Sequence, residues 1–215
     1  MSTLCIPYIN ISATDCASSL HSQLQLCGAA VAVSCNNWSE QFAYAPSVKA
    51  RLAFSDSHIF VAFDVEEEHI AAVELADNGR VWEDSCVEFF VVNPVGAGYF
   101  NFELNCIGTL LAAYRTSRES ATHFSAEQLS RVVRHTSLEH KTTDIRQGGK
   151  WWAVLAVPFE LLGVEVAPAS LRANLYKCGD NLARPHYLSW APIELDKPNF
   201  HCPDYFGELI LDRNE

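Results

Sequence analysis

Amide and carboxylate side chains occupy alternate positions along residues 99–105. Asn101, Glu103 and Asn105 fall on one side of an alternating pattern whose other side is apolar. Such alternation predicts a half-buried β-strand that carries its polar groups on a single face. Amides and carboxylates form hydrogen bonds readily, and Tyr99 places an aromatic ring beside them. Together these groups suit a ligand rich in hydroxyl groups.

The preceding residues predict the partner strand of a hairpin. Within residues 81–92, Phe89 and Val91 alternate with Glu88 and Phe90, and a turn containing Pro94 follows at residues 93–98. Alternating runs on both sides of a turn rich in Gly and Pro are typical of a β-hairpin. Glu88 therefore joins the candidate polar groups.

A third segment repeats this arrangement near the C-terminus. Asn174 and Tyr176 lie on the polar side of residues 171–176, and Lys177 follows directly. If this strand lies beside the hairpin, the polar faces form one patch. Arg115 and His201 add two more polar groups that we expect near it.

The chain shows many short strand patterns, frequent turn signals and little helix. We therefore expect an all-β fold, an antiparallel immunoglobulin-like β-sandwich with short helical turns. A single domain is expected over residues 1–215, with residues 1–30 as an N-terminal extension. Residues 26–35 are expected to form a strand, and Leu111 and Ala113 are expected to face the core.

The amino-acid composition limits the classes of partner that the chain is expected to bind. An apolar share of 49% and an aromatic share of 11% are ample for a packed core. The net charge of −11 argues against nucleic acid and against an anionic membrane surface as the main partner, and it suits a neutral ligand. No apolar run is long enough for a transmembrane helix. No pattern predicts a particular oligomeric state.

The chain contains 8 cysteines, none in a Cys-x-x-Cys pair, so the spacing typical of zinc sites is absent. Cys86 and Cys106 are placed to approach each other across the hairpin, but each also suits a small core residue. We expect buried thiols rather than a disulfide framework, which favours a reducing compartment. The N-terminal residues lack the features of a secretory signal, so a cytoplasmic location is expected, or a secreted or periplasmic one if a signal peptide has been removed.

Several of these segments resemble the family 9 carbohydrate-binding modules. More closely, they resemble the family 9-like proteins within the broader group of DOMON-type β-sandwiches. The resemblance extends from about residue 46 to residue 211, and its most specific part is a tryptophan motif that leads into a strand. The segments that carry it are Trp82-Glu83-Asp84-Ser85-Cys86-Val87-Glu88, residues 99–105, Ser189-Trp190-Ala191-Pro192 and Phe206-Gly207-Glu208-Leu209.

The resemblance implies a sugar clamped between two tryptophan rings, here Trp82 and Trp190, with polar side chains fixing its hydroxyl groups. Glu88 matches a sugar-binding carboxylate of the family. The implied ligand is a mono- or oligosaccharide, in support of xylan or glucan catabolism and without catalysis or a bound cofactor, although the resembled modules carry structural calcium. The full candidate set is Trp82, Glu88, Asn101, Glu103, Asn105, Arg115, Asn174, Tyr176, Lys177, Trp190 and His201.

Other interpretations stay open at this point. Some DOMON-type domains hold haem or sense redox state, commonly with an axial methionine, and the only methionine here is Met1. A glycosidase would use paired carboxylates from Glu83, Asp84, Glu88 or Glu103.

Two further acidic features also have alternative interpretations. Glu88 is as well placed for an ion pair with Arg115 as for sugar binding. The acidic run at residues 66–68 is expected to be a solvated loop, with a calcium site as the alternative.

Overall fold

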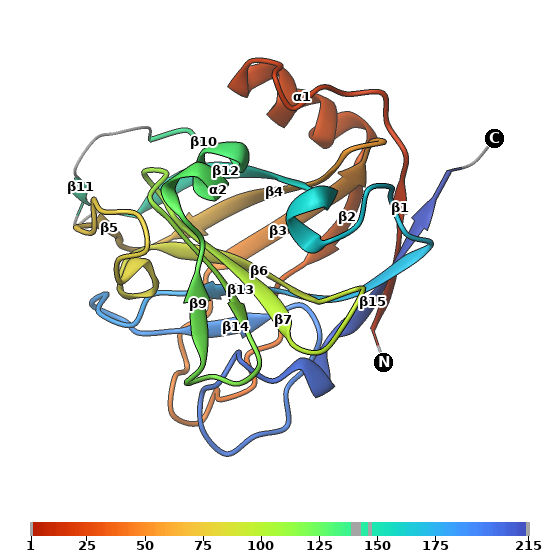
Figure 1. Cartoon of the computed structure of the whole chain (residues 1–215). Coiled ribbons are helices and arrows are strands. Elements are labelled where there is room, and N and C mark those ends of the chain that lie inside the picture. The colour runs from red at the N-terminus through yellow and green to blue at the C-terminus, as the bar shows by residue number, and fades with distance from the viewer. Residues whose placement is uncertain (1, 139–142, 146–147, 214–215) are drawn as a thin grey trace.

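The computed structural model describes residues 2–138, 143–145 and 148–213, in which two sheets pack face to face (Figure 1). The larger sheet of these residues has eight strands. In spatial order they are β1 (Thr3–Pro7), β15 (Gly207–Asp212), β13 (Ser170–Cys178), β6 (Cys86–Val92), β7 (Tyr99–Asn105), β8 (Leu110–Arg115) and β9 (Ala121–His123), with β14 (Tyr187–Ser189) also paired to β13.

The smaller sheet of the described chain has five strands. Their order is β10 (Val133–Thr136), β12 (Gly149–Pro158), β4 (His58–Glu67), β3 (Ser47–Phe54) and β2 (Ala29–Ala32). The remaining elements are the strand pair β5 (Ile70–Ala72) and β11 (Thr143–Ile145), the helices α1 (Ala17–Cys27) and α2 (Ala126–Arg131), and the 3-10 turns Val81–Glu83, Phe159–Leu162 and Pro203–Tyr205. The expected all-β sandwich is confirmed. Among the named strands of the described residues, all pairs are antiparallel except β1 with β15.

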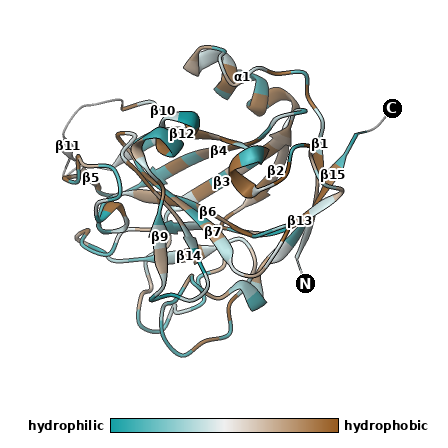
Figure 2. Cartoon of the chain, viewed as in Figure 1, coloured by the Kyte–Doolittle hydropathy of each residue, from teal (hydrophilic) through white to brown (hydrophobic). Residues whose placement is uncertain are grey.

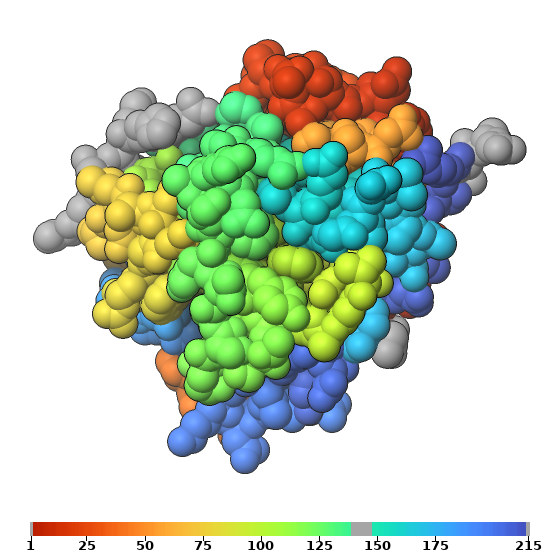
Figure 3. All heavy atoms as spheres, in the orientation of Figure 1, coloured from red at the N-terminus to blue at the C-terminus, as the bar shows by residue number. Residues whose placement is uncertain are grey.

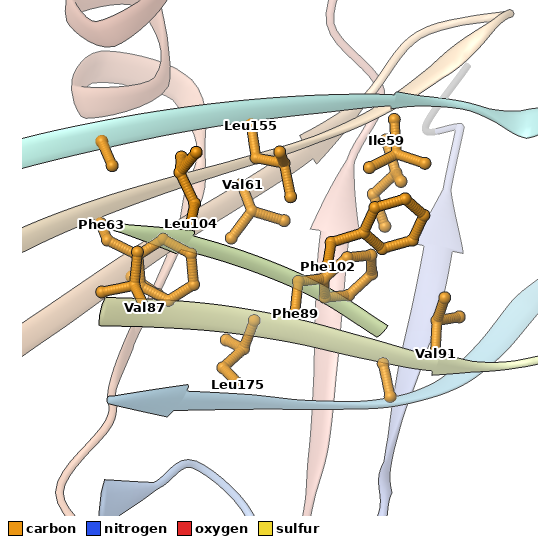
Figure 4. Close-up of a cluster of buried hydrophobic side chains, with 14 of the residues drawn as sticks. Ile59, Val61, Phe63, Val87, Phe89, Val91, Phe102, Leu104, Leu155 and Leu175 are labelled. Atoms are coloured by element: carbon orange, nitrogen blue, oxygen red, sulfur yellow. The ribbon is translucent and has the colours of Figure 1, made fainter. Parts of the chain in front are cut away.

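The main core lies between the two sheets. Figure 4 shows Phe89 of β6 and Phe102 of β7 pointing toward Val61 of β4 and Leu155 of β12. These side chains occupy alternate positions of their strands, as the sequence predicts, and all are fully or almost fully buried. Removing them from water is the main force that holds the sheets together. The same segregation is visible as brown, apolar stretches along the central strands in Figure 2.

Residues 1–30, predicted as an extension, contribute a strand and a helix to the sandwich. β1 pairs with β15, and Ile6 is buried in the main core. In α1, Leu20 and Leu24 are four residues apart, so they share a helix face, and they pack on the outer side of the smaller sheet. α1 lies at the surface, in red at the top of the space-filling view (Figure 3).

The strand expected at residues 26–35 is shorter than predicted. Leu26 and Cys27 belong to the end of α1, and only Ala29–Ala32 form strand β2. At the helix end the Gly28 backbone N–H donates to the Leu24 carbonyl, and a Cβ at Gly28 would lie 2.7 Å from that oxygen. The glycine therefore permits the tight change from helix to strand.

The central strands β6 and β7 of the larger sheet, with most of β8 and β13, are buried on both faces. The outer face of this sheet is covered by the segments around residues 38–42 and 187–206, visible in orange and blue below β13 and β14 in Figure 1. Trp38, Phe200 and Phe206 from these segments form a second apolar cluster with Phe90 and Tyr176 of the sheet. A face that alternation alone would assign to solvent is thereby removed from water.

The expected orientation of β8 is wrong by one residue. Leu110 and Ala112 face the main core, whereas Leu111 and Ala113 are buried on the outer face. Because both faces of the strand are apolar, hydrophobicity did not distinguish them.

A buried ion pair joins the two sheets. Lys177 follows Leu175 on the inner face of β13, and its Nζ lies 2.8 Å from Oε2 of Glu67 at the end of β4. The Trp151 Nε1 donates to Glu67 Oε1 over 2.7 Å, and Nε2 of His186 lies 2.9 Å from Lys177 Nζ. Both charged side chains have no solvent exposure. The expected sugar-binding role of Lys177 is therefore wrong, and so is the solvated loop expected at Glu67.

Neither helix in the described residues has the length and apolar character that crossing a bilayer requires.

We expect replacement of Lys177 by Met to lower the free energy of unfolding by about 3–5 kcal/mol, because it leaves the Glu67 carboxylate buried without a cation. The double variant Lys177→Met/Glu67→Gln should recover most of that loss, since the glutamine amide still accepts from Trp151. Denaturant unfolding of both variants measures the difference.

The matched control is Lys150→Met, which breaks the exposed 3.4 Å pair between Lys150 and Glu66. This variant should lower the free energy of unfolding by less than about 1 kcal/mol. A Lys177→Met protein as stable as the wild type would show that the buried pair contributes little to stability.

Candidate functional site

A cavity of about 270 Å³ opens on the outer face of the larger sheet. It lies where β6, β7, β8 and β13 run side by side and where the covering segments leave the sheet accessible. Its lining combines acidic, basic and aromatic side chains: Trp82, Glu88, Glu103, Arg115, Arg118, Cys178, Asp180, Tyr187, Pro198, Asn199, Phe200 and His201.

Two carboxylates face each other at the base of this pocket. Glu88 and Glu103 are directly opposite in the pairing of β6 with β7, and each side chain is 3% exposed. Burial disfavours the ionised form, so it raises the pKa of both groups, to about 7 for Glu103 and well above the usual range for Glu88. The pair therefore provides hydrogen-bonding oxygens in a site largely shielded from water.

Arg115 supports Glu103 through an amide. Its Nε donates to Asn101 Oδ1 over 2.9 Å, and Asn101 Nδ2 donates to Glu103 Oε1 over 2.9 Å. The Arg115 Nη1 also donates to the backbone carbonyl of Arg118. Asn101 is fully buried and acts by orienting these two groups; it does not line the pocket.

Glu88 has a different partner. Its Oε1 accepts from the thiol of Cys178 over 3.0 Å. No ion pair joins Glu88 to Arg115 within the described chain, so the alternative salt bridge does not form. Glu88 thus lies at the pocket base without a compensating cation among the described residues.

Trp82 provides an aromatic surface at the pocket. It lies in the 3-10 turn Val81–Glu83, and its carbonyl accepts from the Asp180 backbone N–H over 3.1 Å. The Arg80 guanidinium lies 5.8 Å from the centre of the ring. Trp82 is half-buried, is held at its backbone and lines the cavity.

His201 and Phe200 supply aromatic groups from the C-terminal covering segment. His201 Nδ1 lies 3.0 Å from the Tyr99 hydroxyl oxygen, and burial, with Arg115 nearby, lowers the pKa of its ring to about 3. The ring is therefore neutral at physiological pH. Phe200 stacks on Tyr176, with ring centres 4.1 Å apart and planes 7° apart.

Asp180 and Tyr187 complete the polar lining. Burial raises the pKa of Asp180 to about 6, an effect that a hydrogen bond with Tyr187 opposes. Burial and the neighbouring Asp180 also raise the pKa of the Tyr187 hydroxyl. Both groups follow β13 in the chain, on the side where Trp82 is anchored.

Trp190 is not part of the pocket. It is 8% exposed, belongs to the main core between the sheets and is absent from the cavity lining. A Cβ at Gly207 would lie 2.8 Å from its ring carbon Cη2, so the absence of a side chain at Gly207 makes room for the indole. The expected clamp of Trp82 and Trp190 is therefore wrong: the two rings lie on opposite faces of the larger sheet.

Three other predicted residues are buried in supporting positions. Asn105 donates to Asp84 Oδ2 and accepts from the Thr109 backbone N–H, so it fixes the turn after β7. Asn174 donates to the Ala191 carbonyl and accepts from the Ala191 backbone N–H. The Tyr176 hydroxyl donates to the Phe200 carbonyl. Each shares the polar face that the sequence predicts, but all three lie outside the cavity lining.

The pocket also includes residues that sequence reasoning missed: Arg118, Cys178, Asp180, Tyr187, Pro198, Asn199 and Phe200. Cys178 continues the alternation of Asn174 and Tyr176, so strand parity alone could have identified it. The residues of the covering segments have no periodic pattern, because their positions depend on how the loops fold over the sheet.

The pocket can hold a polar ligand by hydrogen bonds beside aromatic surfaces. Carboxylates accept hydrogen bonds, guanidinium groups donate them, and a neutral imidazole does both. His201 is the single histidine of the lining, so the described residues of this pocket offer no pair of imidazoles for a haem iron.

The family model described as carbohydrate-binding family 9 matches residues 21–211. A crystal structure of a candidate carbohydrate-binding protein from Bacteroides uniformis is 34% identical, with a TM-score of 0.91 over 98% of this chain and 99% of that one.

Two structures of a carbohydrate-binding module family 9 from Caldicellulosiruptor kristjanssonii, one with glucose and one with cellotriose, share the fold at 12% identity. Their TM-scores are 0.60 and 0.58, over 100% of this chain and 97% and 95% of theirs. Among curated proteins, none matches this chain.

Glu103 should make stability depend on pH. Its carboxyl has a pKa of about 7 when folded and 4.5 as an ordinary glutamate, so the folded protein holds this proton more tightly than the unfolded chain. The stabilisation is complete below pH 4.5 and is lost as pH rises to about 7. Over this pH window the free energy of unfolding of the wild type should fall by on the order of 3 kcal/mol more than that of Glu103→Gln. Denaturant unfolding at several pH values measures the difference.

The control is Glu165→Gln, which changes an exposed carboxylate and should leave the profile of the wild type unaltered. If the free energy of unfolding changed with pH in the same way in the wild type and in Glu103→Gln, the raised pKa of Glu103 would be contradicted.

Proposed function

This chain belongs to carbohydrate-binding family 9, and from that premise we propose that it binds a mono- or oligosaccharide in the pocket at Trp82 without chemically altering it. The observation that carries the proposal is the meeting of an aromatic surface with desolvated hydrogen-bonding groups in one small cavity. The apolar face of a pyranose packs on an aromatic ring, and its hydroxyl groups need such polar partners at the edge.

The size of the cavity favours a single sugar ring. At about 270 Å³ it lies just below the range typical for drug-sized ligands. We propose that one ring, free or at the end of a chain, enters the pocket while any further rings stay outside.

The polar groups have distinct roles in this proposal. Sugar hydroxyl groups interact with the carboxyl oxygens of Glu88, Glu103 and Asp180. The guanidinium of Arg115 donates hydrogen bonds to the sugar. His201 uses Nε2, because Nδ1 is already occupied by Tyr99. These groups are held by the sheet before the ligand arrives, which reduces the entropy that binding must overcome.

The similar proteins suggest the first ligands to test. The two Caldicellulosiruptor kristjanssonii structures contain glucose and cellotriose, which makes glucans the leading candidates. Xylose and xylo-oligosaccharides form the second series, since support of xylan or glucan catabolism is the wider role that we propose.

Replacing Trp82 by Ala should weaken sugar binding by about 1–3 kcal/mol, the usual effect of losing an aromatic group from the centre of a binding site. Isothermal titration with glucose, cellotriose and xylotriose measures the affinity.

The matched control is Trp152→Ala. Trp152 is also half-buried, but it belongs to β12 of the smaller sheet and stacks on His21 of α1. The Trp152→Ala variant should bind the sugars with the affinity of the wild type. Equal affinity in the wild type and in a folded Trp82→Ala protein would remove Trp82 from the site.

Binding without turnover is tested separately. We expect no release of the aryl group when the protein is incubated with aryl glucosides and xylosides, although Glu88 and Glu103 face each other at the pocket base. Steady release that disappears in Glu88→Gln would instead assign a glycosidase that uses this carboxylate pair.

A further inference from the structure

Two thiols and a carboxylate converge beneath the pocket. The ligand atoms of Cys86, Glu88 and Cys178 all lie within 4.8 Å of one another, and the three residues are 0%, 3% and 1% exposed. We propose that these three side chains bind a thiophilic divalent metal ion, with Zn²⁺ as the leading candidate. The proposal concerns a different ligand from the sugar, although the two sites share Glu88 and Cys178; Cys86 does not line the cavity.

The strands hold the three groups in place. Cys86 and Cys178 are direct partners in the pairing of β6 with β13, and Glu88 lies two residues along β6 on the same face. A site on neighbouring central strands is more rigid than one on loops. The side chains are therefore arranged before any metal arrives.

The local charge balance lacks a cation. Glu88 faces Glu103 across the strand pair, and like charges at such positions repel. Arg115 reaches Glu103 through Asn101, whereas Lys177 lies on the opposite face and is paired with Glu67. The partner of Glu88 in the described residues is the Cys178 thiol, which carries no positive charge. A metal ion at this point would supply the positive charge that the Glu88 carboxylate needs once it gives up its proton.

The donor types favour zinc over the hard cations. Thiolates select Zn²⁺ among the common ions, whereas Ca²⁺ and Mg²⁺ require oxygen ligands. With Zn–S bonds of about 2.3 Å, a tetrahedral site separates two thiolates by roughly 3.8 Å, so small rotations about χ1 bring the three groups into place. Three protein ligands leave the fourth position for water or a ligand atom. Glu88 and Cys178 both line the cavity, so that position can face the pocket.

Metal binding must displace protons. Cys86 and Cys178 are both fully or almost fully buried, which favours the neutral thiol over the thiolate, so both are protonated before the metal binds. Each S–H proton and the proton of the Glu88 carboxyl leave to the solvent as the sulfur and carboxylate electron pairs bind the ion, and no oxidant is needed. Affinity should therefore increase with pH.

The test uses the full chain, purified in reductant and stripped with a chelator. We expect isothermal titration with Zn²⁺ to give one ion per chain. Titration with Co²⁺ should produce a thiolate-to-metal charge-transfer absorption. Cys86→Ala should weaken Zn²⁺ binding by roughly 100-fold or more, since removing even a group that only supports a ligand costs up to about 100-fold.

Cys202→Ala is the matched control. Cys202 is half-buried in the same covering segment as His201, outside the proposed ligand set, and its loss should leave metal affinity unchanged. If Cys86→Ala fails to fold, the Co²⁺ spectrum of the wild type still decides, because only sulfur ligands produce the charge-transfer absorption. The proposal would be overturned if that absorption were absent. It would also be overturned if Cys86 and Cys178 were joined by a disulfide that persists in the protein purified in reductant.

Sugar titration of the metal-stripped wild type separates the two proposals. Sugar binding without metal binding would overturn only the metal site, and metal binding without sugar binding would overturn only the proposed function.

Discussion

Burial of both faces of the larger sheet at its central strands is the constraint on which the rest of the structure depends. A sheet in a two-layer sandwich usually leaves one face to water, and there its polar side chains need no partners. Here loops cover the outer face, so Asn101, Glu103 and Asn174 must form hydrogen bonds with neighbouring groups. The pocket is the part of this face that the loops leave accessible. Its polar groups are thus already desolvated and oriented, as a weak hydrogen-bonding ligand such as a sugar requires.

Buried charged groups have different partners on the two faces of the larger sheet. On the inner face, Lys177 and Glu67 neutralise each other and connect the sheets. On the outer face, Glu88 and Glu103 lie side by side, and Arg115 reaches only one of them through an intermediate amide. A paired charge suits a structural role, whereas a pair of desolvated carboxyl groups at an accessible pocket is suited to interact with a ligand or a cation. This contrast supports the proposal that the ligand binds on the outer face.

Strand periodicity allowed much of this fold to be predicted, because it reports which side chains share a face. It identified the hairpin, the polar face of β7 and the apolar partners in the core. It gave the wrong face for Leu111 and Ala113, because a strand that is apolar on both sides carries no such signal. Lys177 and Trp190 were misplaced for another reason. The family resemblance assigns Trp190 to the clamp, but the space above Gly207 admits its indole into the core. Strand parity places Lys177 inside the sandwich.

The remaining features depend on strand pairing that no local pattern encodes. Cys86 and Cys178 are far apart in the chain and become neighbours only because β13 pairs with β6 in one register. The pocket residues Asp180, Tyr187 and Phe200 likewise come from segments that acquire a place only when they fold over the sheet. The sheet fixes Glu88 and Glu103, so changes in the covering segments would alter the shape and aromatic surfaces of the pocket without moving these carboxylates. Ligand preference should therefore vary with the loops between homologous chains more readily than the fold does.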